Sequence, residues 1–166
     1  MNDQLSALEA RVQRLEDREA IKELKGRYFR LVDEKDWDAW RRLFTDDATF
    51  DFGDGTVVEG ADAFVAAVRG MVDGVNVART VHHGHMPELS FDGPSEARGS
   101  WVLADYLEWE PDPETGGRRG VRGYGHEVET YRKIDGEWKI ATWVLSYIRM
   151  DPLPSEPLSQ EMFVGP

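Results

Sequence analysis

The chain has 166 residues, a length typical of one domain with a substantial core. Its 32 acidic residues outnumber the 20 basic ones, and the formal charge of −12 disfavours nucleic acids and anionic membrane surfaces as partners. The absence of cysteine excludes disulfides, thiolate catalysis and cysteine-ligated metals, and no apolar run is long enough to span a membrane or act as a secretion signal. We therefore expect a cytoplasmic protein.

Apolar residues spaced by three and four positions predict helices in the N-terminal quarter of the chain. One series runs from Leu5 to Leu15 and a second from Ile21 to Leu31, with Asp17 as the expected N-cap of the second helix. A third, short helix is expected over 36–44.

Turn residues and alternating patterns then organise the rest of the chain. "ATFDFGDGTVVEG" (48–60) predicts a β-hairpin, and 61–74 predicts a helix closed by a glycine. Four long strands are expected at about 77–91, 97–110, 121–134 and 138–150. Helices followed by an antiparallel meander indicate an α+β domain over 1–150, and the Pro-rich tail, 151–166, is expected to be coil that either closes a pocket or reaches a neighbouring subunit.

Asp105 is an isolated carboxylate on an apolar strand face. In "WVLADYLEW" that face carries Trp101, Leu103, Asp105, Leu107 and Trp109. A buried carboxylate needs a partner or a proton, and an imidazole is a suitable partner. The sequence therefore predicts that a histidine lies beside Asp105.

The segment "TVHHGHMPEL" (80–89) supplies three of the four histidines. His82 and His83 must point to opposite faces of a strand, so at most one of them meets Asp105. This divergence argues against a three-histidine metal site, and no metal or cofactor is expected. Until a family is considered, these histidines can equally be surface or satisfied core residues.

Aromatic and polar residues on the strands are candidates for lining an apolar pocket. Tryptophans fill cores and subunit interfaces as readily as pockets, and His126 can be solvated, so both readings stay open. The candidate substrate-binding residues are Trp101, Tyr124, His126, Trp143, Tyr147 and Arg149.

Four separated segments together resemble the SnoaL-like branch of the nuclear-transport-factor-2-like superfamily. They are "IKELKGRYFRLVDEKDWDAWRRLF", "HHGHMPEL", "ARGSWVLADYLEW" and "ETYRKIDGEWKI", within 17–150. Within this branch the chain is similar to the bile-acid 7α-dehydratases. The superfamily also contains scytalone dehydratase, ketosteroid isomerases, a hexachlorocyclohexane dehydrochlorinase, polyketide cyclases and non-enzymatic proteins. The resemblance implies a cone-shaped fold, with N-terminal helices packed on a strongly curved, mostly antiparallel sheet that encloses a deep apolar pocket.

The resemblance also implies positions for site residues. The dehydratase pattern places its tyrosine on Tyr28, its helical aspartate on Asp33, its histidine on His82 and its strand aspartate on Asp105. Helical spacing alone does not put Tyr28 and Asp33 on one stripe. The pattern's arginine falls on Tyr147, and Arg149 follows two residues later.

These residues lead to the hypothesis of a cofactor-free dehydratase. His82 is expected to remove a proton, Asp105 to orient the imidazole, and Tyr28 to donate to an enolate or a leaving hydroxyl, with Asp33 orienting Tyr28 or assisting the leaving group. The expected partner is a hydrophobic oxygenated compound such as a steroid, terpenoid or polyketide. The alternatives are an isomerase or cyclase with the same residues, or a non-catalytic binding protein. A homodimer or homotrimer is expected, since family members commonly associate through the sheet.

Overall fold

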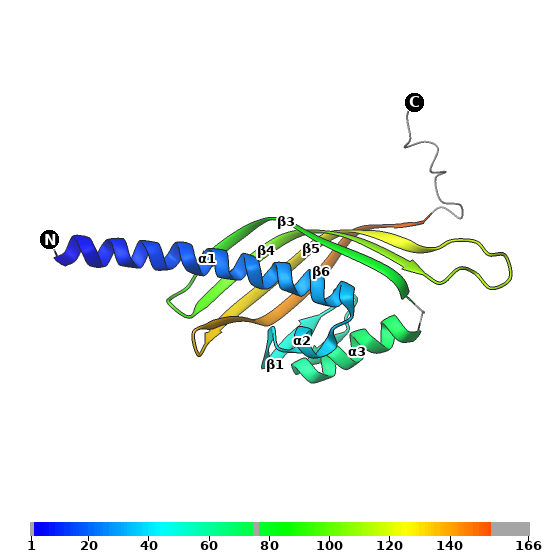
Figure 1. Ribbon diagram of the computed structural model, residues 1–166, viewed down its shortest axis with the longest axis horizontal. Helices are drawn as coiled ribbons and strands as arrows, with labels where there is room; N and C mark the ends of the chain where they lie inside the picture. Colours follow the sequence, from blue (N-terminus) through cyan, green and yellow to red (C-terminus); the bar gives the residue numbers. More distant parts are fainter. Residues whose placement is uncertain (1, 75–76, 154–166) are drawn as a thin grey trace, which may run out of the picture.

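The computed structural model describes residues 2–74 and 77–153, and its first element is one long helix (Figure 1). Helix α1 (Asn2–Glu34) runs without interruption, so the predicted new helix start at Asp17 is wrong. No proline or glycine precedes Gly26, so nothing in the sequence breaks the helix there. The Asp17 carboxylate instead accepts hydrogen bonds from Lys133 (2.7 Å) and Trp138 (2.9 Å).

A short helix, a hairpin and a second helix follow. Helix α2 (Trp37–Arg41) begins at the N-cap Asp36, whose side chain accepts from the Ala39 amide at 3.0 Å. It is shorter than predicted because Phe44 already begins strand β1 (Phe44–Asp51). The predicted hairpin between β1 and β2 (Val57–Glu59) and the helix α3 (Ala61–Gly74) are confirmed.

The remaining chain forms the antiparallel meander that the sequence predicted. Its strands are β3 (Val77–Phe91), β4 (Glu96–Trp109), β5 (Arg119–Ile134) and β6 (Glu137–Pro152). The six-stranded sheet has the order β2-β1-β6-β5-β4-β3, and only the β1–β6 pair is parallel. The predicted α+β class, with helices beside a curved sheet, is confirmed.

Helix α1 crosses one face of the sheet, while α2 and α3 lie near β1 (Figure 1). Between them, Trp40, Phe44, Phe50 and Phe64 form an aromatic cluster in which the Phe50 and Phe64 rings are stacked 3.6 Å apart. Gly84 on β3 allows α1 to approach, because a β-carbon there would lie 2.4 Å from the Phe29 ring. The inner face of the sheet thus forms a concave surface under α1.

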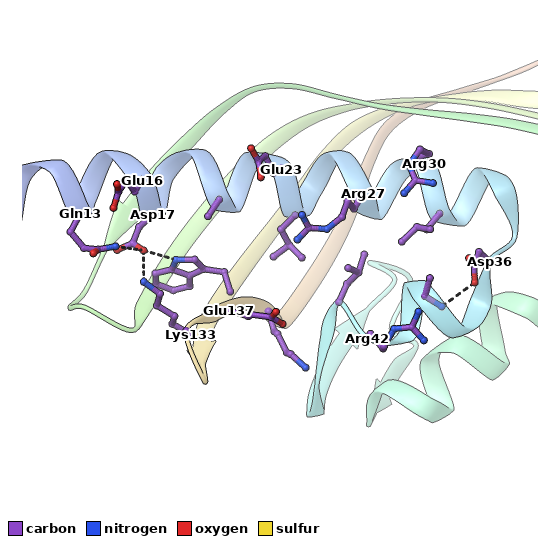
Figure 2. Close-up of a pocket in the computed structure, with 18 residues that line it drawn as sticks. Gln13, Glu16, Asp17, Glu23, Arg27, Arg30, Asp36, Arg42, Lys133 and Glu137 are labelled. Atoms are coloured by element: carbon purple, nitrogen blue, oxygen red, sulfur yellow. Dashed lines mark hydrogen bonds and ion pairs between the residues drawn. The ribbon is translucent and has the colours of Figure 1, made fainter.

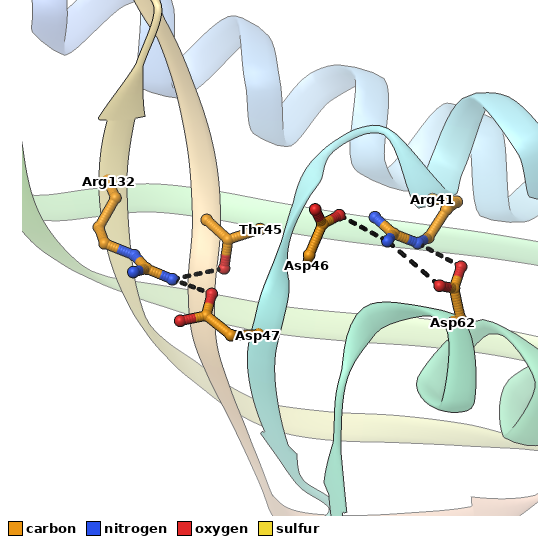
Figure 3. A network of polar contacts seen from close by, with 6 residues as sticks. All are labelled: Arg41, Thr45, Asp46, Asp47, Asp62 and Arg132. Atoms are coloured by element: carbon orange, nitrogen blue, oxygen red, sulfur yellow. Dashed lines mark hydrogen bonds and ion pairs between the residues drawn. The ribbon is translucent and has the colours of Figure 1, made fainter.

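Polar contacts fix β1 to its neighbours (Figure 3). The Arg41 guanidinium donates to Asp46 (2.7 Å) and to Asp62 (2.6 Å), joining α2 to β1 and α3. On the other side of β1, Arg132 of β5 donates to Thr45 and Asp47. These exposed pairs contribute little free energy individually, but together they link β1 to α2, α3 and β5.

The predicted tail lies mostly outside the described residues, which end at Leu153. Within the described ranges, no helix is long and apolar enough to cross a membrane.

Candidate functional site

A cavity of about 430 Å³ lies between the helices and the inner faces of β3 to β6. Most of its lining is apolar, including Val32, Phe64, Leu103 and Trp143. A few polar groups converge on it, which is typical of a small-molecule site. They are Tyr28, Lys35, Thr80, His82, Asp105, Glu127 and Tyr147.

His82 is fixed by a carboxylate at the end of helix α1. Its Nδ1 lies 2.6 Å from Asp33 Oδ1. Asp33 also accepts from the Thr80 hydroxyl (2.7 Å) and from the backbone amide of His82 (3.1 Å). Because Asp33 is held by three contacts, it can keep the imidazole in one orientation and leave Nε2 as the ring nitrogen for other chemistry.

The surroundings of this pair favour charge on the imidazole. Burial lowers the pKa of His82, but the hydrogen bond to Asp33 and the negative charges of Asp105, Asp33 and Glu127 outweigh it, so the pKa is raised above 6.5. The Asp33 pKa is lowered: burial opposes this, but hydrogen bonds from His82 and Thr80 more than offset it. A proton taken up by His82 is therefore stabilised.

Asp105 stands directly opposite His82 in the β3–β4 register. One carboxylate oxygen, Oδ2, accepts a hydrogen bond from the Tyr147 hydroxyl, whereas the buried Oδ1 has no hydrogen-bond partner among the described residues. Burial raises the pKa of Asp105, although His82 and Tyr147 act against this. Asp105 thus belongs to the cavity lining and has one buried carboxylate oxygen without a hydrogen-bond partner among the described residues.

The aspartate that contacts the imidazole of His82 differs from the one predicted. His82, which the family resemblance selected, lines the same cavity as Asp105, but the imidazole is hydrogen-bonded to Asp33. Strand parity assigns side chains only to the two faces of the sheet. It could not identify Asp33, which approaches β3 from the last turn of α1. The expected orientation of His82 by Asp105 is corrected accordingly.

Tyr28 lies in the cavity wall, on the same helix as Asp33. The side chain is buried, and its ring contacts Phe29 and Trp40. Burial and nearby negative charge raise the pKa of Tyr28 well above 10. Its hydroxyl therefore keeps its proton and remains a hydrogen-bond donor.

A buried ionic cluster behind the cavity was missed by the sequence analysis. Lys25 Nζ contacts Glu129 Oε1 and lies 2.6 Å from Glu127 Oε2, and all three residues are at most 2% exposed. Trp143 donates to Glu127 Oε1 at 2.8 Å. Burial raises the pKa of Glu129 despite the charge of Lys25. The sequence does contain a signal for this cluster, because the charged residue Lys25 lies within the apolar stripe from Ile21 to Tyr28.

Two predicted pocket tryptophans have different positions. Trp143 lines the cavity, as expected for a substrate-binding residue. Trp101 is buried in the core instead, where its Nε1 donates to the Tyr131 hydroxyl at 2.8 Å. The apolar face that carries Trp101 and Asp105 therefore continues past the cavity into the packed interior.

Three other predicted pocket residues, Tyr124, His126 and Arg149, face away from the cavity. On β5 the buried residues Glu127 and Glu129 alternate with Tyr124 and His126, which lie on the outer face. Arg149 was expected to share a face with Tyr147, but a bulge on β6 reverses the alternation: Tyr147 pairs with Gly125 and Arg149 with Tyr124.

The outer face also carries the other two histidines of the "HHGH" segment. The exposed rings of His83 and His85 stack in parallel with centroids 6.0 Å apart. Within residues 2–74 and 77–153, no group of three or more histidine and carboxylate side chains is arranged to hold a metal ion.

A larger hollow, of about 880 Å³, lies elsewhere (Figure 2). It is a groove between α1, α2 and the β5–β6 turn, lined by side chains of both charges such as Glu23, Arg27, Arg42 and Glu137. It contains no histidine and is far more polar than the cavity under α1. We therefore assign the candidate site to the smaller, apolar cavity.

Comparisons with known proteins agree with this architecture. Residues 13–144 match the SnoaL-like domain family. A protein described as a candidate scytalone dehydratase from Novosphingobium aromaticivorans superposes with a TM-score of 0.75 at 20% identity, over 89% of this chain and 92% of that one. A type 2 hexachlorocyclohexane dehydrochlorinase (LinA) gives a TM-score of 0.76 at 18% identity, over 89% and 96%.

A third solved structure comes from Mycobacterium tuberculosis and has no known function. It gives a TM-score of 0.68 at 26% identity, over 82% of this chain and 74% of that one. At such identities the structural similarities concern the fold, whereas the domain match covers most of the chain. The protein therefore belongs to the SnoaL-like family, with the fold of the nuclear-transport-factor-2-like superfamily.

Proposed function

We propose that the protein is a cofactor-independent lyase that removes water from a hydrophobic hydroxylated carbonyl compound. The observation that carries the proposal is the fixed position of His82, bonded through Nδ1 to Asp33 and facing Asp105 across two strands in an apolar cavity. An imidazole held in this way has one ring nitrogen left to act as a base.

The first step is removal of a carbon-bound proton next to a carbonyl group. Its C–H electron pair moves into the developing enolate, and the proton passes to Nε2 of His82. Asp33 stabilises the imidazolium that results, in the role that Asp105 was expected to have. The apolar lining strengthens this interaction because it keeps the local dielectric constant low.

The second step is loss of the hydroxyl group. As the carbon–carbon double bond forms, the C–O bond breaks and the leaving oxygen takes the proton of Asp105, whose burial favours the protonated form. The leaving group departs as water. Transfer of the proton from His82 to Asp105 then restores both residues, so the reaction needs no external acid, base or oxidant.

Tyr28 supplies the third function, a hydrogen bond to the carbonyl oxygen. Because its pKa is raised far above neutrality, it remains a donor while negative charge accumulates on the enolate oxygen. The buried Lys25 ammonium, 3.8 Å from the centroid of the Tyr28 ring, lies behind this donor.

The charge of Glu127 favours a neutral substrate group in its part of the cavity. Glu127 lines the cavity, and Lys25 is shared between Glu127 and Glu129. A carboxylate or phosphate beside Glu127 would meet like charge in an apolar environment, whereas Lys35 is a cation elsewhere in the lining. A steroid-, terpenoid- or polyketide-like ring system with one ketone and one hydroxyl fits these requirements.

The names of the related structures support elimination chemistry. A candidate scytalone dehydratase and the hexachlorocyclohexane dehydrochlorinase share the fold over most of their length. Both names denote elimination reactions, of water in one case and of a hydrogen halide in the other.

Isomerisation is the second candidate. The pairing of Tyr147 with the protonation-prone Asp105 resembles donor sets that stabilise a dienolate. With such stabilisation, His82 could return its proton to a different carbon, and the product would have the mass of the substrate.

A panel of neutral β-hydroxy ketones, including steroid and polyketide types, tests the proposal by mass spectrometry. We expect at least one compound to lose one water with the wild type and with His83→Gln, but not with His82→Gln. His83 is the matched control, since it adjoins His82 on β3 and faces outward. Equal turnover by both histidine variants would refute the assignment of the base, and an unchanged product mass with a moved double bond would establish isomerisation instead.

A further inference from the structure

Helix α1 has two apolar stripes, and they face in nearly opposite directions. Its second half packs on the sheet through buried residues such as Ile21, Leu24 and Tyr28. Its first half carries Leu5, Leu8, Val12 and Leu15, which we call the N-terminal stripe. At 3.6 residues per turn, the N-terminal stripe lies roughly 170° around the helix from the buried face.

The N-terminal stripe is exposed in the protomer. Leu5, Leu8, Val12 and Leu15 are 56%, 55%, 46% and 63% exposed. This end of α1 projects beyond the edge of the sheet (Figure 1). Isolated exposed leucines are ordinary, but four apolar residues in one line on a projecting helix indicate a surface that another chain covers.

The spacing of the N-terminal stripe is that of a coiled coil. Intervals of three, four and three residues place Leu5 and Val12 at a positions and Leu8 and Leu15 at d positions of two heptads. In the second heptad, β-branched Val12 at a with Leu15 at d is the combination that favours two strands, whereas the first heptad has leucine at both positions. The occupant that matches this pattern is an identical helix.

The flanking charges select the orientation of the two helices. Glu9 and Glu16 occupy e positions, and Arg11 and Arg18 occupy g positions. In a parallel pair, Arg11 of each helix faces Glu16 of the other helix, which gives two ion pairs. An antiparallel pair would instead place g positions opposite g positions and e positions opposite e positions, so that like charges face each other. Arg11 and Glu16 form no ion pair within the described residues of one protomer, so both remain available.

We propose that two copies of this chain associate through a short parallel coiled coil formed by the N-terminal stripe. Each protomer's sheet lies on the far side of its helix from the partner, so the cavities stay clear of the contact. The heptads end at Leu15, because the next a and d positions hold Glu19 and Lys22, which form an exposed ion pair within one helix. The proposal does not depend on the proposed reaction.

Sedimentation velocity of the full chain across a concentration series tests the proposal. We expect a monomer–dimer equilibrium whose dissociation constant rises at least about 100-fold in Leu8→Glu, because a charge cannot be buried in the seam. The matched control is Ser6→Glu, which adds the same charge on another side of the same turn and should behave as the wild type. The proposal would be overturned if the wild type stays monomeric or forms a trimer, or if the Leu8→Glu variant dimerises as well as the wild type.

Disulfide trapping tests the orientation, because the chain contains no natural cysteine. Leu5→Cys should give a covalent dimer on mild oxidation, since parallel helices place the two Leu5 positions side by side. Ser6→Cys should remain monomeric under the same conditions. Cross-linking that occurs only when Leu5→Cys is mixed with Leu15→Cys would show an antiparallel pair and overturn the parallel arrangement.

Discussion

The Nδ1 atom of His82 and the Oδ1 atom of Asp33 lie 2.6 Å apart, so a helix end and a strand together fix the orientation of one imidazole. We predict that Asp33→Asn lowers turnover on the order of 10³-fold, because an amide can donate to Nδ1 and so move the proton to Nε2. Initial-rate kinetics on a substrate from the panel would measure this. Glu34→Gln, which changes the exposed neighbouring carboxylate, is the control; equal effects of the two would exclude an orienting role for Asp33.

The proposed base gives the reaction a defined pH dependence. The pKa of His82 is raised above 6.5. The proposed reaction needs a neutral imidazole together with a protonated Asp105, so turnover should pass through a maximum: it falls toward low pH, where His82 is protonated, and toward high pH, where Asp105 is ionised. Asp33→Asn removes a cause of the raised pKa of His82 and should shift the imidazole titration, followed by NMR, to lower pH. A His82 that titrates at or below 6.5 in the wild type would contradict the proposed electrostatics.

The buried ionic cluster should be important for stability. Lys25→Met leaves Glu127 and Glu129 buried without their cation, which should lower the free energy of unfolding by roughly 3–5 kcal/mol. Chemical denaturation measures the change. Lys22→Met, on the same helix but in an exposed pair with Glu19, should change stability by less than about 1 kcal/mol. Similar losses in the free energy of unfolding for both variants would show that the buried cluster stabilises the protein no more than an exposed ion pair does.

Gly123 makes room for the hydrogen bond between Tyr147 and Asp105. A β-carbon at position 123 would lie 2.4 Å from the Tyr147 ring, so Gly123→Ala should displace the ring and break that bond. We expect Gly123→Ala and Tyr147→Phe to reduce turnover by similar factors and to be non-additive when combined. Gly93→Ala, where a β-carbon meets nothing within 4 Å, is the control. Additive losses of turnover would show that Gly123 and Tyr147 act independently of each other.

The sequence patterns predicted the elements of the fold well. Alternation located β3 to β6 within about two residues of their bounds, since strand period and turn residues are local signals. The predicted break in α1 failed because a polar "EDRE" stretch need not interrupt a helix. There the apolar stripe changes sides, and the carboxylate of Asp17 is bound by residues of the distant β5–β6 turn.

The sequence predicted only part of the site, and the parts that it missed have physical causes. Parity allowed one of His82 and His83 to meet Asp105, and the family resemblance selected His82, which lies in one cavity with Asp105. Neither argument showed that Asp33 would contact His82 from a helix. The misplacement of Arg149 arose from a bulge that no local pattern marks. Both faces of β5 carry apolar residues, so alternation could not decide that Glu127 lies inside and Tyr124 outside.

The tautomer of His82 tests the account most directly, because it can be measured without a substrate. Long-range proton–nitrogen NMR of the ¹⁵N-labelled protein, above the pKa of His82, reports which ring nitrogen carries the proton. We predict protonated Nδ1, bonded to Asp33, and unprotonated Nε2 available as a base. A neutral His82 protonated on Nε2 would leave no basic nitrogen for proton removal and would contradict the proposed reaction.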